Sequence, residues 1–224
     1  MKNSVRFITL IIAVLLVLGL SACGGKDGGE KTAPTAATTT EQPFPDPTTY
    51  IPSEPENPEE NGAVSDGVYT NKWADFSFRI PDGWKDITDE MKFETSSSKL
   101  VFASRDSVAV SGMYSNLNVI LEKIPSDSQI KTTEDYAEEA KKTLADSLKA
   151  QGITAVVSDE IETVSIGEEE YRALRSDCNL VGVEYIQYSI CRVVDTRAVI
   201  ITISVPNDEA AADLMTFLAD THLD

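Results

Sequence analysis

Cysteine and histidine, which carry much of enzyme and metal chemistry, are scarce in this chain of 224 residues. The sequence has three cysteines, Cys23, Cys178 and Cys191, and a single histidine, His222, close to its end. A Ser-His-Asp triad, a Cys-His dyad and a histidine-rich zinc site each need a histidine inside the fold. We therefore expect no such catalytic or metal site, and we expect His222 to be a solvated tail residue.

Cys178 and Cys191 are predicted to lie on successive strands of a meander. If the connection turns at residues 181–184, Cys178 lies opposite about residue 187, and Cys191 is roughly 13 Å further along the sheet. A disulfide needs Cα atoms within about 7 Å. The spacing favours two buried, inert thiols on one face, with a disulfide as the alternative.

Two acidic stretches could in principle do chemistry. Glu168–Glu170 follow Gly167 at a predicted hairpin and could hold Ca²⁺, but alternating strand geometry turns the middle carboxylate away from the others. The second stretch lies near Trp84 and could supply a glycosidase-type acid and base; it comprises Asp82, Asp86, Asp89 and Glu90. We expect both stretches to be solvated and Trp84 to plug a core, and we predict no metal and no cofactor.

The charge balance excludes one class of partner. The formal net charge is −18, from 19 basic and 37 acidic residues. Binding of nucleic acid depends on Lys and Arg displacing counterions from phosphates, so this charge disfavours a nucleic-acid partner.

The first residues have the layout of a secretory signal peptide. Lys2 and Arg6 precede an apolar run from Phe7 to Leu20, which is shorter than the roughly 20 residues of a membrane span. An uncleaved anchor helix is the alternative. We predict that residues 1–22 are a signal peptide.

The end of this run, Leu20-Ser21-Ala22-Cys23, resembles the lipobox of bacterial lipoproteins at all four positions. The resemblance implies cleavage before Cys23 and diacylglycerol on its thiol, and two acyl chains are enough for stable anchoring. The protein is then expected at the extracytoplasmic face of the cell membrane. An ordinary signal peptide followed by a chance cysteine is the alternative.

Residues 23–65 are predicted to be a lipidated N-terminus followed by a disordered linker. The segment is rich in Thr, Glu and Pro, and prolines at seven positions remove backbone donors. A flexible chain of about 40 residues spans roughly 35–40 Å on average. The linker would hold a domain away from the membrane; a recognition strand at Pro43–Pro47 is the alternative.

Residues 66–224 are predicted to be one α+β domain with a mainly antiparallel sheet flanked by helices. Phe76, Phe78 and Ile80 alternate with polar residues, as in a half-buried strand. Further predicted strands cover 100–104, 117–124, 155–157, 160–165, 171–178, 185–194 and 198–205.

Two helices are predicted in this domain. The first has Thr133 as its cap and an apolar stripe at four-residue spacing, and it ends at Gly152. The second runs from a cap at Asn207 or Asp208 to Ala219 and turns Ala211, Leu214, Met215 and Leu218 inward. A short helical turn at 86–91 is also expected.

The block Phe76-Ser77-Phe78-Arg79-Ile80-Pro81-Asp82-Gly83-Trp84 resembles the start of the PsbP/Mog1-like superfamily, and the order of elements over residues 68–220 is similar too. The resemblance implies an α/β/α sandwich and a non-enzymatic binding or accessory role. It transfers no functional residue. We expect a lipid-anchored module with an envelope protein or wall polymer as partner; an extracytoplasmic hydrolase using Asp, Glu and Ser is the alternative.

Overall fold

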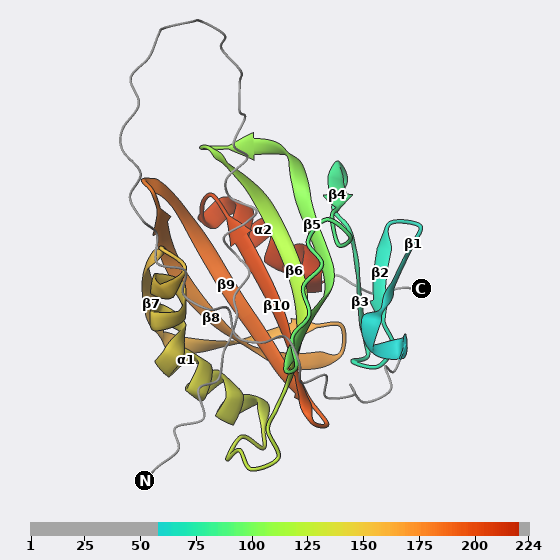
Figure 1. Cartoon of the computed structure of the whole chain (residues 1–224). Coiled ribbons are helices and arrows are strands. Elements are labelled where there is room, and N and C mark those ends of the chain that lie inside the picture. Colours follow the sequence, from blue (N-terminus) through green and yellow to red (C-terminus); the bar gives the residue numbers. More distant parts are fainter. Residues whose placement is uncertain (1–57, 220–224) are drawn as a thin grey trace, which may run out of the picture. The chain divides into compact units, whose positions relative to one another are not determined.

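The computed structural model describes residues 58–219. The predicted signal peptide, the lipobox with Cys23, the linker up to residue 57 and His222 all lie outside the described residues. The described elements, drawn in Figure 1, are η2 (Pro58–Asn61), β1 (Ala63–Ser65), β2 (Val68–Asn71), β3 (Phe76–Arg79), β4 (Trp84–Asp86), β5 (Ser98–Val110), β6 (Met113–Lys123), α1 (Thr133–Ala150), β7 (Thr154–Ile166), β8 (Glu169–Leu180), β9 (Val183–Val194), β10 (Arg197–Val205) and α2 (Asp208–Ala219).

The strands form two antiparallel sheets. The smaller sheet has the order β1-β2-β3, and the larger has the order β4-β5-β6-β10-β9-β8-β7. The last four strands of the chain are joined by short turns, whereas β10 pairs with β6 across α1 and three intervening strands. These sheets and the two helices confirm the predicted α+β class with a mainly antiparallel sheet.

The two helices lie on opposite faces of the seven-stranded sheet (Figure 1). Side chains alternate between the faces along each strand. Ile120 and Ile200, which are register partners, pack in one core cluster with Ala137 of α1. Ile201, the next residue along β10, belongs to another cluster with Leu214 of α2 and residues of the small sheet. We call these surfaces the α1 face and the α2 face.

Helix α1 is where the sequence predicts it, but its cap is one residue earlier than expected. Thr132 has an extended backbone, and its hydroxyl accepts a hydrogen bond from the backbone N–H of Asp135, whose carboxylate caps Thr132 in return. The hydroxyl of Thr133 instead accepts from the backbone N–H of Val193, so it ties α1 to β9. Gly152, with φ of +82°, follows the helix end as predicted.

The folded part begins earlier than the predicted boundary at residue 66. Helix η2 and strand β1 lie within the segment predicted as linker, and β1 pairs with β2. Proline and acidic residues are so frequent there that the composition alone predicts a linker rather than a folded segment. What stabilises these residues is the main domain, through contacts described below.

Two local predictions differ from the structure. The runs predicted as separate strands at 155–157 and 160–165 form one strand, β7, because a register shift between Val157 and Ile161 absorbs the polar residues between them. The helical turn expected at 86–91 is a single hydrogen-bonded turn after β4, in which the backbone N–H of Met91 donates to the carbonyl of Ile87.

Neither helix within residues 58–219 combines the length and the apolar character that a bilayer span requires.

Candidate functional site

The most unusual feature of the domain is a group of neutral polar side chains on the α1 face of the large sheet. They come from four adjacent strands, β6, β10, β9 and β8. We call this group the polar block; it consists of Asn116, Asn118, Thr202, Ser204, Gln187, Ser189 and Ser176.

Strand register brings these residues together in two neighbouring rows. In the first row, Asn116 pairs with Ser204, Ser204 with Gln187, and Gln187 with Ser176. In the second row, Asn118 pairs with Thr202, which pairs with Ser189. Directly paired residues of an antiparallel sheet have Cβ atoms about 4.5–5.5 Å apart and point to the same face. The block is therefore one continuous surface.

The block is buried, yet most of its polar groups have no partner. The seven side chains are between 0% and 9% exposed. The side chains of Asn116 and Asn118 are joined by one hydrogen bond of 3.3 Å. Both polar atoms of the Gln187 side chain are unpaired, as are Asn118 Oδ1 and the four hydroxyls of the block. Buried polar groups are normally hydrogen-bonded to protein groups or to ordered water, and the described protein groups do not pair with these atoms.

The surroundings of the block are apolar on one side and basic on another. The next row along the strands consists of Ile120, Ile200 and Cys191, which form ordinary core with α1. At the β5 edge, Arg105 pairs with Asn116, and its guanidinium lies 4.7 Å from the ring centroid of Tyr114. The block is thus a neutral patch with Arg105 at its β5 edge.

Of the four carboxylates predicted to cluster near Trp84, three line one cavity and Asp82 does not. Asp86, Asp89 and Glu90 line a cavity of about 450 Å³ together with Asn61 and other residues. All three carboxylates are exposed, and Asp86 accepts hydrogen bonds from the backbone and hydroxyl of Thr88. Among the described residues, the cavity is therefore lined by exposed carboxylates and by no buried one.

The acidic stretch Glu168–Glu170 is divided by strand geometry as predicted. Glu168 and Glu170 are exposed, while Glu169 forms an ion pair with Arg192 at 2.9 Å. Within residues 58–219, no group of three or more acidic, cysteine or histidine side chains is placed to hold a metal ion.

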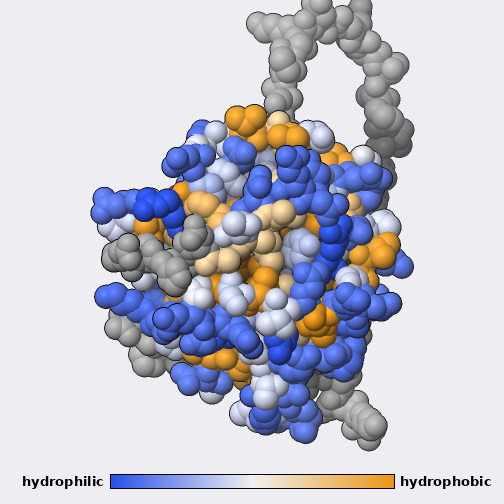
Figure 2. All heavy atoms as spheres, turned by 180° about the vertical axis from the view of Figure 1, so that it is seen from behind, coloured by the Kyte–Doolittle hydropathy of each residue, from blue (hydrophilic) through white to orange (hydrophobic). Residues whose placement is uncertain are grey.

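Trp84 is half-buried and has two kinds of neighbour. It packs against the core of the α2 face, and it lines a cavity of about 210 Å³ with Leu214 and Phe217 of α2. It is therefore more exposed than a core plug. Figure 2, which views the molecule from the side opposite to Figure 1, shows hydrophobic residues gathered at the middle of a largely hydrophilic surface.

Cys178 and Cys191 are free and buried, as the sequence predicts. The turn lies at Val181–Gly182 rather than over four residues, so Cys178 pairs with Tyr185 and is six residues from Cys191 along the sheet. Burial raises the pKa of the Cys178 thiol to about 11 and that of the Cys191 thiol to about 12. Both thiols are protonated at neutral pH and inert as nucleophiles.

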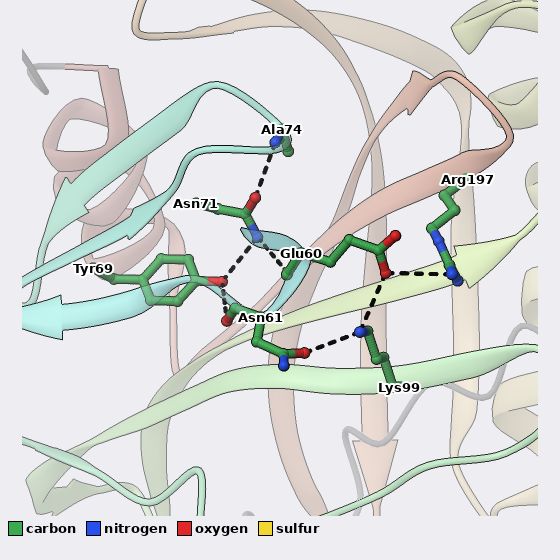
Figure 3. A network of polar contacts seen from close by, with 7 residues as sticks. All are labelled: Glu60, Asn61, Tyr69, Asn71, Ala74, Lys99 and Arg197. Atoms are coloured by element: carbon green, nitrogen blue, oxygen red, sulfur yellow. Dashed lines mark hydrogen bonds and ion pairs between the residues drawn. The ribbon is translucent and has the colours of Figure 1, made fainter. Parts of the chain in front are cut away.

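A polar network attaches η2 to both sheets (Figure 3). The carboxylate of Glu60 lies 3.2 Å from Lys99 Nζ on β5 and 3.3 Å from an Arg197 guanidinium nitrogen on β10. Lys99 also donates to the side-chain oxygen of Asn61 at 2.9 Å. The backbone carbonyl of Glu60 accepts from the side-chain amide of Asn71 on β2 at 2.8 Å. This network fixes the point where the N-terminal segment joins the domain.

One carboxylate in the core has a strongly perturbed proton affinity. Glu122 of β6 is 4% exposed, and its Oε2 accepts a hydrogen bond of 3.1 Å from the Tyr136 hydroxyl of α1. Burial raises the pKa of Glu122 to about 7, although the Tyr136 hydrogen bond lowers it. Glu122 lies on the α1 face, two alternating positions beyond Asn118 and separated from it by the Ile120 row.

Sequence reasoning missed the polar block. The signal was present as polar pairs at i and i+2 in otherwise apolar strands: Asn116 with Asn118, Gln187 with Ser189, and Thr202 with Ser204. Each pair alone is typical of a solvent-facing strand. Only the pairing of β6 with β10, distant in sequence, shows that all three pairs share a buried face.

No protein-family model matches the sequence, and no curated protein matches it. Among solved structures, the chain is similar to cyanobacterial PsbP from Synechocystis, with 19% identity and a TM-score of 0.49 over 71% of this chain and 94% of that one. It is similar to a protein from Bacteroides thetaiotaomicron, with 14% identity and a TM-score of 0.41, over 66% of this chain and 44% of that protein. It is also similar to the Ran-binding protein Mog1p of Saccharomyces cerevisiae, with 11% identity and a TM-score of 0.33, over 62% of this chain and 76% of that protein. These are similarities of fold alone.

Proposed function

We propose that the protein is a non-enzymatic binding module, anchored by lipid on Cys23 at the extracytoplasmic face of a membrane. The observation that carries the proposal is the lipobox sequence Leu20-Ser21-Ala22-Cys23. The binding role is supported by the state of the described carboxylates and thiols, which are exposed, paired or protonated.

The hydrolase alternative has less support. The carboxylates at the 450 Å³ cavity are exposed, and Glu122 has the Tyr136 hydroxyl as its hydrogen-bond partner. The two cysteines have thiols that stay protonated at neutral pH. The described groups therefore favour binding over catalysis.

The anchor is tested by partition of the expressed full chain between detergent and aqueous phases. We expect the wild type in the detergent phase and the Cys23→Ala variant in the aqueous phase. Equal partition of the two proteins would contradict lipidation at Cys23.

The binding role is tested by crosslinking the full chain in intact cells and identifying the crosslinked products by mass spectrometry. We expect one dominant partner from the cell envelope. Recovery of no partner would contradict the binding role.

A further inference from the structure

We propose that the cavity of about 450 Å³ beside β1 is a docking groove for an extended segment of a partner protein that carries lysine or arginine side chains. This inference rests on the proposed function, because it names the surface that binds and the kind of partner that it takes.

The cavity brings buried apolar residues together with exposed ones. Ile87, Val101 and Phe102 line it and are between 1% and 8% exposed. Val64 of β1 also lines it and is 43% exposed. An incoming apolar side chain can therefore enter past Val64 and lose contact with water against the buried residues.

Strand β1 offers an unpaired edge at this cavity. It is the outer strand of the small sheet, and among the described strands it pairs only with β2. Ala63 and Val64 are consecutive residues, so their side chains point to opposite faces of the sheet, yet both residues line the cavity. The cavity therefore reaches the backbone of β1, where an extended segment can add as a further strand.

The charged residues of the cavity are all acidic. Asp86, Asp89 and Glu90 are exposed there, and the described residues that line the cavity include no Lys or Arg. Glu90 forms no ion pair within residues 58–219. Asp89 lies 3.0 Å from Lys92 Nζ, but both side chains are highly exposed, and exposed ion pairs of this kind are weak. These carboxylates are available to a ligand, and they favour one with positive charges.

A hydrogen-bonded turn holds the carboxylates beside the apolar residues. The backbone N–H of Glu90 donates to the Ile87 carbonyl at 3.0 Å, and the backbone N–H of Ile87 donates to the Ala103 carbonyl on β5 at 2.9 Å. The Thr88 hydroxyl accepts from the backbone N–H of Ala103 at 2.9 Å. The turn is thus attached to the large sheet, so binding has little of it left to order.

Charge distinguishes this occupant from two that the same chain could supply. Residues 32–57, which precede the cavity in the sequence, hold four acidic residues and no Lys or Arg. A second copy of the chain brings a further net charge of −18. Like charges placed against each other across an interface are unfavourable. A basic segment of another protein is therefore the occupant that these charges select.

The experiment selects binders to the full chain carrying Cys23→Ala from a displayed library of short random peptides, and measures the affinity of the synthesised binders by calorimetry. We expect the selected peptides to alternate Lys or Arg with apolar residues, and their affinity to fall as the salt concentration rises. Glu90→Gln should weaken binding by about threefold and Glu90→Lys by at least about tenfold. Val64→Lys should also weaken it by at least about tenfold, because the added strand passes this side chain.

The matched controls are Glu168→Lys and Val181→Lys. They change an exposed carboxylate and an exposed valine that do not line the cavity. Both variants should bind the selected peptides within about twofold of wild type, since only charges near the docked peptide act on it strongly.

Each other outcome overturns the inference in a recognisable way. Selected peptides that lack basic residues would refute the charge of the partner. Basic peptides that bind Glu90→Lys and Val64→Lys as tightly as wild type would place their site elsewhere. A dimer of the chain that Val64→Lys dissociates would assign the groove to a second copy. If no peptide is selected, the basic segment is refuted, while crosslinking in intact cells still decides the proposed function separately.

Discussion

Glu122 makes the stability of this domain depend on pH in a direction opposite to that of most carboxylates. Its pKa is raised by burial from an ordinary value of 4.5 to about 7. The folded state therefore holds a proton that the unfolded state releases at lower pH. The associated stability is fully present below pH 4.5 and is lost as the pH rises to 7 and above.

The magnitude follows from the pKa difference. A shift of about 2.5 units at 1.36 kcal/mol per unit gives about 3 kcal/mol, which is a large part of the stability of a domain. In the Glu122→Gln variant the side chain stays neutral and can still accept the Tyr136 hydrogen bond, so it should lose this pH dependence. We expect the two proteins to be similarly stable at pH 4.5, and Glu122→Gln to be more stable by about 3 kcal/mol at pH 8.

The assay is urea unfolding of both proteins between pH 4.5 and pH 8, comparing the free energies of unfolding at each pH so that other titrating groups cancel. Tyr136→Phe serves as a second variant. It removes the hydroxyl that lowers the pKa of Glu122, so its pH-dependent loss of stability should extend to higher pH. A difference between wild type and Glu122→Gln that does not change with pH would refute the reasoning.

Three further predictions concern the N-terminal junction and the thiols. Gly62→Ala should lower the free energy of unfolding in urea by at least about 2 kcal/mol, because φ is +66° and a Cβ would lie 2.6 Å from the Tyr69 hydroxyl. The control is Gly182→Ala, where φ is also positive but the space is open, and this variant should lose about 1 kcal/mol. Equal losses in the two variants would contradict the clash. Glu60→Gln should lower the free energy of unfolding by about 2 kcal/mol, which is less than the loss of a fully buried ion pair because the Arg197 side chain is 21% exposed. A change of less than about 0.5 kcal/mol would show that the network does not stabilise the junction. In the Cys23→Ala chain, Cys178 and Cys191 should resist alkylation at pH 8 until urea unfolds the domain, whereas fast labelling of the native protein would contradict their burial.

The parts of the fold that were predictable are those determined by local pattern. The four-residue stripe of α1 and the cap at Asn207, whose side-chain oxygen accepts from the Ala210 N–H, follow from neighbouring residues. The alternation of Phe76 and Phe78 likewise marks β3. Features that depend on pairing between distant segments were not predictable. The burial of Glu60 and Gln187 arises from strands far away in the sequence, and both residues read locally as solvent-facing.

The Glu60 network also determines how the domain would respond to mechanical force. A pull on the chain upstream of Pro58 reaches the fold first at η2, and Glu60 transmits it to β5 through Lys99 and to β10 through Arg197. Strands β5 and β10 flank β6 in the middle of the large sheet, so the load is shared between two strands rather than peeling one strand from an edge. Once these ion pairs break, tension passes to the short strand β1 and opens the small sheet next. Under force, the junction and the small sheet would therefore unfold before the large sheet.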